Sequence, residues 1–482
     1  MSFGSPVYRL SILFFCVGFV VNVCGQSLSV KEKIDQYLQR RSSNTNIPGF
    51  SVAVVHQDSV LLSKGYGHSD DGTPVTGETP FAIASLSKGF TAMSVLQLVD
   101  SGLIELDKPV IHYIPNLKIN DSRIDLMTVR QLLNQTSGLS DKDFPELTLT
   151  QPLSLSESLS RWKSATLTDS PGDKFHYHNP NYQLLALLVE TVSKQKFGNY
   201  LQQHIFSPLK MSNTNEFANT TDFYKQLSPG HIYFSGIPIT IRDPEWFIEG
   251  AAGITSTSND LAHWLTLQTD QNNLQGMQIL SREGLATMRT PSKSSSTYAM
   301  GWFVRDESWY HSGILWTYSA EEIILIQEGY GIVLLFNGGI NAYIDYYSFL
   351  SGILQIIHGE EPEVPSLPWW TIPFFVDVLF LIAIGLSIRK VFKTRKWYQY
   401  YQQNLFWKSV VNFIVRLIPL LILISIPSLL TALSGRVLSN YRIFLMAPDI
   451  IAGLAIYALL QVIIVTLRIT FVIRQLRTTL QN

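Results

Sequence analysis

The sequence predicts a mixed α+β domain followed by three membrane-spanning helices. Three observations support this: strand-like runs at both ends of the region before residue 360, helical apolar spacing between them, and long apolar stretches after residue 368. The chain has 482 residues, of which 46% are hydrophobic and 15% are charged. So little charge is unusual for a purely soluble protein, and this length favours two or more units.

The N-terminus, residues 1–25, is typical of a secretory signal peptide. Arg9 supplies positive charge, residues 10–21 are apolar, and small residues precede a predicted cut before Gln26. An uncleaved N-terminal anchor is the alternative. In both cases we expect the segment that follows to be exported.

Composition also excludes several classes of site. Both cysteines, Cys16 and Cys24, lie within the signal segment, so a cleaved chain has no thiol for disulfides or cysteine-metal sites. The formal net charge of -1 provides no basic surface for nucleic acid. We expect no cofactor and no metal.

Residues 26–359 are predicted to form the globular domain. Runs at 50–55 and 59–62 are rich in β-formers, as are runs at 322–327 and 331–336. Strands at both ends with helices between them indicate one α+β domain whose ends meet in one sheet. Helices are predicted over 90–99, 182–192 and 258–265.

After an acidic, proline-rich linker at 360–368, residues 369–482 are predicted to form a three-helix transmembrane region. The segments 369–388, 410–433 and 449–472 are each long enough to cross a bilayer. The loop 389–408 is basic and has no acidic residue, whereas the loop 434–447 has only Arg436 and Arg442. The positive-inside rule therefore places loop 389–408 and the C-terminus in the cytoplasm and the globular domain outside.

Two charges fall within these spans, Asp377 and Arg416. A charge at membrane depth is costly and is a candidate for function. We favour a structural explanation, either an Asp–Arg pair or charges reached by water that hold a small bundle together, because three helices leave little room for a transport path.

A serine-lysine pair is the first candidate for chemistry, since the sequence has no GxSxG, HExxH or CxxC motif. Ser85 and Lys88 have the SxxK spacing, which places both on one helix face and lets the amine activate the hydroxyl. The same spacing occurs at Ser160, Ser193 and Ser207, in more polar surroundings typical of exposed helix faces. Ser85 instead precedes an apolar helix, where the helix dipole favours negative charge.

Two further segments could complete a site. Tyr177 and Asn179 follow a turn; a nearby lysine would favour the tyrosine phenolate, and the asparagine could hold Lys88 and donate to a substrate carbonyl. His311, Ser312 and Gly313 precede an apolar strand, and the next backbone N–H, at Ile314, could point at an oxyanion. Each segment alone carries little weight.

In this order, the three segments resemble the motifs of the beta-lactamase-related serine hydrolases, which include class C beta-lactamases, penicillin-binding D-alanyl-D-alanine carboxypeptidases and esterases. Three flanking segments also resemble the family: 132–139 (LLNQTSGL), 250–257 (GAAGITST) and 298–302 (YAMGW). The resemblance covers about residues 30 to 355 and not the spans.

The resemblance implies a beta-lactamase/transpeptidase-like fold, an antiparallel sheet flanked by helices plus an all-helical lobe. Ser85 would be acylated, and Lys88 and Tyr177 would share the general base and acid roles. The substrate-binding residues would be Asn179, His311, Ser312 and Gly313, and the oxyanion hole would be the backbone N–H groups of Ser85 and Ile314.

The chain departs from the family pattern at three places. Gln135 replaces a usual histidine, which we expect to affect packing more than chemistry. The stretch 314–318 (ILWTY) replaces a glycine-rich segment, and its bulky groups would narrow the cleft or tilt the oxyanion N–H. His311 replaces the lysine of lactamases, which argues against a dedicated beta-lactamase; binding of a carboxylate by charged His311 should weaken above about pH 6.5.

We therefore expect a multi-pass protein of the cell membrane with an extracellular serine hydrolase domain. It would act by an acyl-enzyme mechanism on a D-amino-acid peptide, an amide or an ester, with peptidoglycan as a candidate partner besides the lipid bilayer. The alternative is a weakly active or inactive penicillin-binding-like ectodomain with a sensory or regulatory role.

Overall fold

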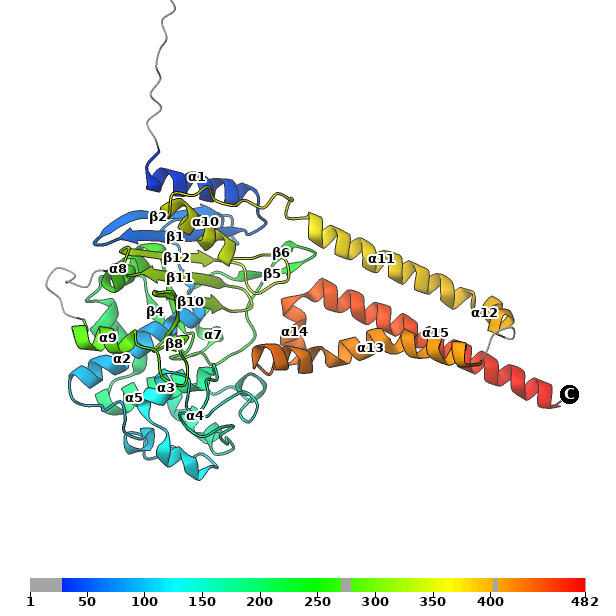
Figure 1. Cartoon of the computed structure of the whole chain (residues 1–482), viewed down its shortest axis with the longest axis horizontal. Helices are drawn as coiled ribbons and strands as arrows, with labels where there is room; N and C mark the ends of the chain where they lie inside the picture. The colour runs from blue at the N-terminus through cyan, green and yellow to red at the C-terminus, as the bar shows by residue number, and fades with distance from the viewer. Residues whose placement is uncertain (1–27, 270–278, 402–405, 482) are drawn as a thin grey trace, which may run out of the picture.

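The computed structural model describes residues 28–269, 279–401 and 406–481. The predicted signal peptide lies outside these residues. At the centre is a seven-stranded sheet in the order β2-β1-β12-β11-β10-β9-β8. β1 (Gly49–His56) pairs antiparallel with β12 (Tyr330–Phe336), with Val52 opposite Leu334. The two ends of the domain therefore meet in one sheet, as predicted (Figure 1).

The remaining strands of this sheet follow one another as antiparallel neighbours. β10 pairs with β11 on one side and with β9 on the other. Because side chains alternate along a strand, each strand presents one row to each face of the sheet. These strands are β2 (Ser59–Gly67), β8 (Tyr298–Ala299), β9 (Trp302–Arg305), β10 (Ser308–Ile314) and β11 (Ser319–Leu325).

Helices cover both faces of the sheet. α1 (Val30–Ser43) and α10 (Tyr347–Ile357) share one core with β1 and β12. On the opposite face, α8 (Ser258–Thr269) packs on β1 and β12, next to α2 (Ser87–Asp100). The helices predicted from apolar spacing are thus confirmed, and they bury the apolar rows of the sheet.

A helical lobe lies beyond α2, against α5 (Asn179–Ser193) (Figure 1). Together, sheet and lobe confirm the predicted beta-lactamase/transpeptidase-like fold. The other helices of the domain are α3 (Val129–Leu133), α4 (Leu155–Trp162), α6 (Phe197–Leu201), α7 (Thr220–Phe223) and α9 (Arg282–Met288), and its short strands are β3 (Phe81–Ala82), β4 (Asn215–Glu216), β5 (Gly230–Phe234), β6 (Ile237–Ile241) and β7 (Ile254–Ser256).

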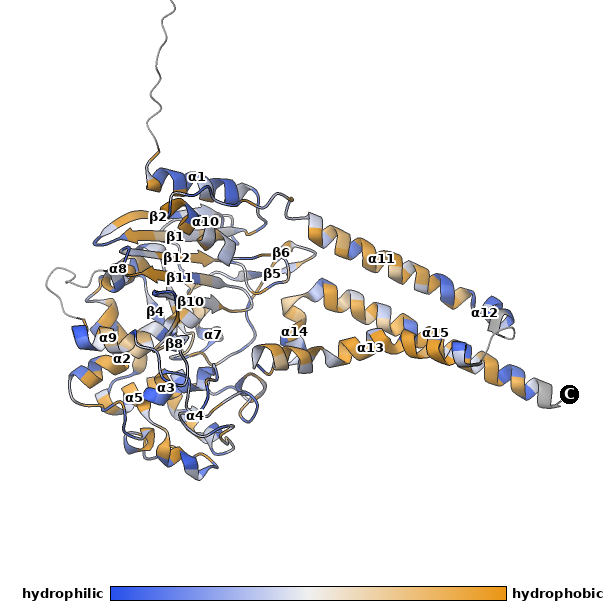
Figure 2. Cartoon of the chain, in the orientation of Figure 1, coloured by the Kyte–Doolittle hydropathy of each residue, from blue (hydrophilic) through white to orange (hydrophobic). Residues whose placement is uncertain are grey.

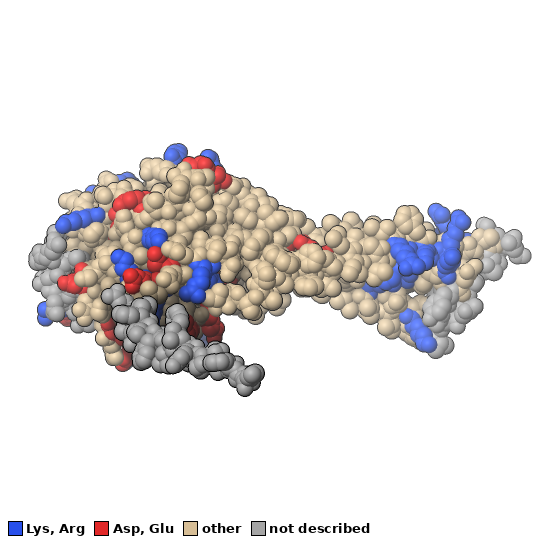
Figure 3. All heavy atoms as spheres, turned by 90° about the horizontal axis from the view of Figure 1, so that it is seen from above, with Lys and Arg blue, Asp and Glu red and all other residues tan. Residues whose placement is uncertain are grey.

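Three helices long and apolar enough to cross a membrane form an arm that projects from the domain, as predicted. Figure 2 shows that apolar residues dominate this arm, and Figure 3 shows Lys and Arg gathered near its far end. The candidate spans are Thr371–Phe392, Trp407–Ser434 and Pro448–Thr478. They lie in α11 (Thr371–Phe392), α13 (Phe406–Ser434) and α15 (Pro448–Gln481), with the short α12 (Thr394–Tyr401) and α14 (Asn440–Met446) between them.

Of the two explanations expected for Asp377 and Arg416, a direct pair is wrong: no ion pair joins them among the described residues. Arg416 instead donates to Gln461 Oε1 at 2.6 Å, and Gln461 donates to Ser387 Oγ at 2.7 Å. Arg416 lies in α13, which begins at the far end of the arm, whereas Asp377 lies in α11 near the domain. The two residues are therefore several helical turns apart along the arm. Arg416 thus links α13, α15 and α11, which agrees with a role in holding the bundle.

The connection from α13 to α15, residues 435–447, turns back onto the globular domain and contains α14. Arg442 Nη2 donates to the backbone oxygen of Glu245 at 2.9 Å, and Trp316 Nε1 donates to the backbone oxygen of Arg442 at 2.9 Å. We call residues 435–447 the docking loop. It ties the arm to the domain at a second place besides the linker before α11.

Candidate active site

Ser85 lies in a 3₁₀ turn, Ala84–Leu86, that leads directly into α2. The turn is anchored to β7 by a hydrogen bond of 3.0 Å from Ile83 N to the Ile254 carbonyl. Ala84 has a φ of +48°, a conformation that non-glycine residues rarely adopt. Such strain persists only where surrounding structure enforces it, and it often accompanies a functional side chain. Ser85 itself is half-buried, so a substrate can reach it.

Lys88 is fully buried one helical turn after Ser85. Its Nζ lies 3.1 Å from Ser85 Oγ, 2.9 Å from Asn179 Oδ1 and 2.8 Å from the Ala251 carbonyl. The last two oxygens can only accept hydrogen bonds. A neutral amine has two N–H groups, which match these two acceptors and leave its lone pair for the Ser85 hydroxyl.

The electrostatic surroundings favour this neutral form. Burial lowers the pKa of Lys88 well below its ordinary value, and the charge of Arg436 lowers it further, while Glu146 raises it. A lysine that is neutral near physiological pH can accept the serine proton. The contacts of Lys88 are those of a general base rather than of a surface cation.

Tyr177 lies just before α5 and faces the same pair. Its ring centre is 4.9 Å from Lys88 Nζ. The expectation that Lys88 favours the phenolate is wrong, because burial raises the pKa of Tyr177 to about 12, although Ser85 and Arg436 oppose this rise. Tyr177 is therefore a neutral phenol suited to donating a proton.

Asn179, the first residue of α5, holds Lys88 as predicted. Its Oδ1 accepts from Lys88, and its Nδ2 donates to Glu146 Oε1 at 3.1 Å. Since Asn179 is buried, these two contacts fix the orientation of its amide. Glu146, which sequence reasoning did not single out, thereby becomes part of the site.

On β10, His311 faces Tyr177, with 3.5 Å between His311 Nε2 and the tyrosine hydroxyl. Its Nδ1 lies 2.8 Å from the Ser312 carbonyl. The expected titration near pH 6.5 is wrong, because burial and the nearby Lys88 lower the pKa of His311 to about 3. His311 is thus neutral at physiological pH and cannot supply the positive charge expected for a substrate carboxylate.

The rest of the β10 motif lies against the serine turn. A Cβ on Gly313 would stand 2.3 Å from the Ile83 carbonyl, so glycine allows β10 to approach the segment before Ser85. Ser312 donates its hydroxyl to Glu321 Oε2 on β11 at 2.7 Å. Ile314 ends the strand and its side chain is exposed. The oxyanion hole formed by the N–H groups of Ser85 and Ile314 stays a prediction.

Two departures from the family pattern find a structural role. Gln135 Oε1 accepts from His178 N at 3.0 Å and also binds the Asn181 side chain, so Gln135 holds the segment that carries Tyr177. In the stretch after Gly313, Trp316 is buried against the docking loop, at 4.6 Å between the Arg442 guanidinium and its ring. Trp316 therefore serves this contact.

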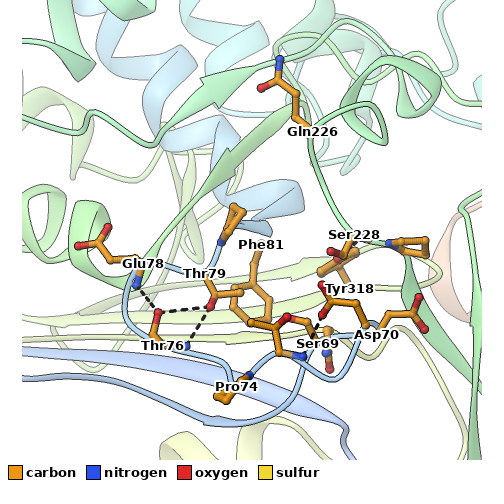
Figure 4. Close-up of a pocket in the computed structure, with 15 residues that line it drawn as sticks. Ser69, Asp70, Pro74, Thr76, Glu78, Thr79, Phe81, Gln226, Ser228 and Tyr318 are labelled. Atoms are coloured by element: carbon orange, nitrogen blue, oxygen red, sulfur yellow. Dashed lines mark hydrogen bonds between the residues drawn. The ribbon is translucent and has the colours of Figure 1, made fainter.

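Figure 4 shows a separate pocket of about 350 Å³, lined largely by the segment between β2 and β3 together with Tyr318. It contains none of the predicted site residues. Its lining carries Asp70, Asp71 and Glu78 but no lysine paired with a serine. The contacts around Ser85, rather than this pocket, identify the candidate active site.

Comparison with known proteins agrees with this arrangement. Residues 33–343 match the family model described as Beta-lactamase. The chain belongs to the beta-lactamase family. It is 30% identical over 316 residues to Protein flp of Staphylococcus aureus (strain MW2), covering 64% of this chain and 63% of flp. The match thus spans less than two thirds of that relative.

Solved structures share the fold. The octameric penicillin-binding protein homologue from Pyrococcus abyssi matches with a TM-score of 0.58 and 23% identity, over 69% of this chain and 78% of the other. EstCE1, described as a hydrolase with promiscuous acyltransferase activity, matches with a TM-score of 0.54 and 20% identity, over 64% of this chain and 93% of the other. These likenesses show that the chain shares its fold with both proteins.

Proposed function

We propose that this protein is a membrane-anchored serine hydrolase that uses Ser85 to form an acyl-enzyme. The observation that carries the proposal is the buried Lys88 amine, held by two carbonyl oxygens with Ser85 Oγ as its third neighbour. An unassisted serine is a weak nucleophile, and this contact supplies the base it needs.

In the proposed reaction, Ser85 Oγ attacks the acyl carbon while Lys88 accepts the hydroxyl proton. The bond to the leaving group then breaks, and Tyr177 or Lys88 returns a proton to that group. Water attacks the resulting ester, the same base takes its proton, and Ser85 is regenerated with release of the acid. The N–H groups of Ser85 and Ile314 would bind the oxyanion.

The substrate class we propose is a D-amino-acid peptide, an amide or an ester, with cell-wall peptide as one candidate. A neutral His311 supports substrates that need no strong cation for a carboxylate, which argues against a dedicated beta-lactamase. The likeness to EstCE1, a hydrolase with acyltransferase activity, is in keeping with ester or amide chemistry.

We further propose that the domain lies outside the cell and that the chain crosses the membrane three times. Basic residues gather near the far end of the arm, in keeping with a cytoplasmic position. The docking loop contacts the domain, so both would lie on one side of the bilayer. This location would give the site access to extracellular substrates.

The test uses a membrane-impermeant fluorophosphonate probe on intact cells that express the full chain. We expect labelling of the wild type, no labelling of Ser85→Ala, and full labelling of Ser160→Ala, a matched control at an exposed SxxK pair. Equal labelling of Ser85→Ala would refute the nucleophile, and labelling only after permeabilisation would refute the location. Hydrolysis of D-Ala-D-Ala peptides, short esters and nitrocefin would then rank the substrates.

A further inference from the structure

The docking loop places one of its two arginines inside the hydrolase domain. Arg436 Nε lies 2.6 Å from Asp141 Oδ2, and its Nη2 lies 2.7 Å from Glu146 Oε1. The next backbone N–H, of Val437, also points to Asp141 Oδ2 at 3.2 Å. A residue from the membrane arm thus pairs with two carboxylates of the domain.

Both carboxylates are buried, with Asp141 2% and Glu146 0% exposed. Two carboxylates shielded from water are costly unless a cation or several donors compensate them. His178 Nε2 lies 3.2 Å from Asp141 Oδ1, and Trp246 Nε1 donates to Glu146 Oε2 at 3.1 Å. Arg436 bridges the pair, and their charges raise its own pKa although burial alone would lower it.

A continuous line of contacts leads from Arg436 to the nucleophile. Glu146 Oε1 accepts from both Arg436 and Asn179, and Asn179 Oδ1 accepts from Lys88, which contacts Ser85. We propose that Arg436 is a positioning residue of the hydrolase site, so that the membrane arm completes the site by holding Glu146 and Asn179 against Lys88. This inference rests on the proposed function.

The same contact has an electrostatic effect. Lys88 is faced by Tyr177, Tyr182 and His311, and its charge state also responds to Glu146 and Arg436. Glu146 favours protonated Lys88, and Arg436 opposes this. Without Arg436, Glu146 would act unopposed, and Lys88 would be protonated up to a higher pH.

A second observation supports a specific docking site. Trp316, in the stretch that departs from the family pattern, donates its indole N–H to the backbone of Arg442 and packs against the Arg442 guanidinium. Its backbone N–H donates to Asp243 Oδ1 at 2.7 Å, which holds the stretch in place. The altered stretch thus contacts the docking loop at Arg442, which is six residues after Arg436 in the sequence.

The test measures the rate of fluorophosphonate labelling of Ser85 between pH 5 and 10, with full-length protein in detergent micelles. The variants are Arg436→Gln, Arg436→Lys, Glu146→Gln and the double variant Arg436→Gln/Glu146→Gln. For Arg436→Gln we expect the acidic limb of the pH–rate profile to shift upward by about one unit. At any pH on that limb, labelling should be roughly tenfold slower, because each unit in the Lys88 pKa changes its neutral fraction about tenfold there.

The double variant separates positioning from folding. Removing Glu146 together with Arg436 removes both opposing charges, so the acidic limb should return toward its wild-type position, and Arg436→Lys should show a smaller shift. A purely structural role would lower the amount of active protein in every variant without moving the limb. Arg305→Gln, on the exposed face of β9, is the matched charge control.

The labelling experiment distinguishes failure of the role of Arg436 from failure of the proposed function. Wild-type protein that is never labelled at Ser85 would overturn the proposed function, and the positioning role with it. Labelled wild type with an unshifted limb in Arg436→Gln would overturn only the role of Arg436. Thermal unfolding of wild type, Arg436→Gln, Glu146→Gln and the double variant gives a second measurement: no coupling between positions 436 and 146 would also overturn the role of Arg436.

Discussion

Two SxxK pairs in this chain have the same spacing and opposite surroundings. Lys88 is fully buried among Ser85, Asn179 and the Ala251 carbonyl. At the end of α4, Lys163 is exposed, and Ser160 donates its hydroxyl to the backbone oxygen of Glu157 in its own helix at 2.9 Å. Spacing alone therefore does not make a nucleophile. Burial and the acceptors around the amine do.

Those acceptors come from segments far apart in the sequence. Asn179 opens α5, and Ala251 lies in the turn before β7, while Lys88 is in the first turn of α2. Only the packing of α5 and β7 against α2 brings them together. Near α4 no such convergence occurs, because that lysine points to solvent.

The largest expected difference between the two pairs concerns the lysines. Lys88→Met should slow fluorophosphonate labelling of Ser85 by roughly 10²–10⁴-fold, because it removes a general base. Lys163→Met should leave the rate unchanged. Labelling rates of the two full-length variants, with thermal unfolding as a check on folding, measure this contrast. Equal rates would show that the buried contact does not activate Ser85.

A smaller effect comes from His311, the buried neighbour of the same cluster. Its pKa is lowered from 6.5 to about 3 in the folded protein. The unfolded chain therefore binds a proton below pH 6.5 that the folded chain does not, so stability is lost as pH falls. Between pH 7 and pH 5 this amounts to about 2 kcal/mol, at about 1.4 kcal/mol for each unit below 6.5.

The variant His311→Asn removes this titration, so it should lose less stability than wild type between pH 7 and pH 5. His112→Asn, at an exposed histidine, is the matched control and should behave as wild type. Thermal unfolding at the two pH values measures both. If wild type and His311→Asn show the same acid sensitivity, His311 is not held neutral by the fold.

Much of the fold and of the candidate site could be predicted from the sequence. The order of the three motifs selected Ser85 and placed Tyr177 and His311 with it, and apolar length predicted the arm. The phenolate expected for Tyr177 and the ordinary pKa expected for His311 were both wrong, because motif spacing carries no information on burial. Motif spacing indicates which residues lie together, but the burial of a titratable group determines whether it is charged.

The contact between Arg436 and Glu146 was missed for a different reason. The two residues are 290 positions apart, and no periodic pattern links them. In the sequence, Arg436 counted only as one of few charges in a loop between spans. Its partner, Glu146, lies in a short turn that carries no motif. Only three-dimensional packing of the arm on the domain relates them.

The central claim is that Ser85 is activated by a neutral Lys88, and the pH dependence of wild-type labelling tests it most directly. The rate constant for fluorophosphonate labelling of Ser85 would be measured in the full-length protein from pH 5 to 11. We predict that the rate levels off well below pH 10.5, the ordinary pKa of lysine, because burial lowers the pKa of Lys88. A rate that keeps rising about tenfold per unit up to pH 10.5 would contradict the claim.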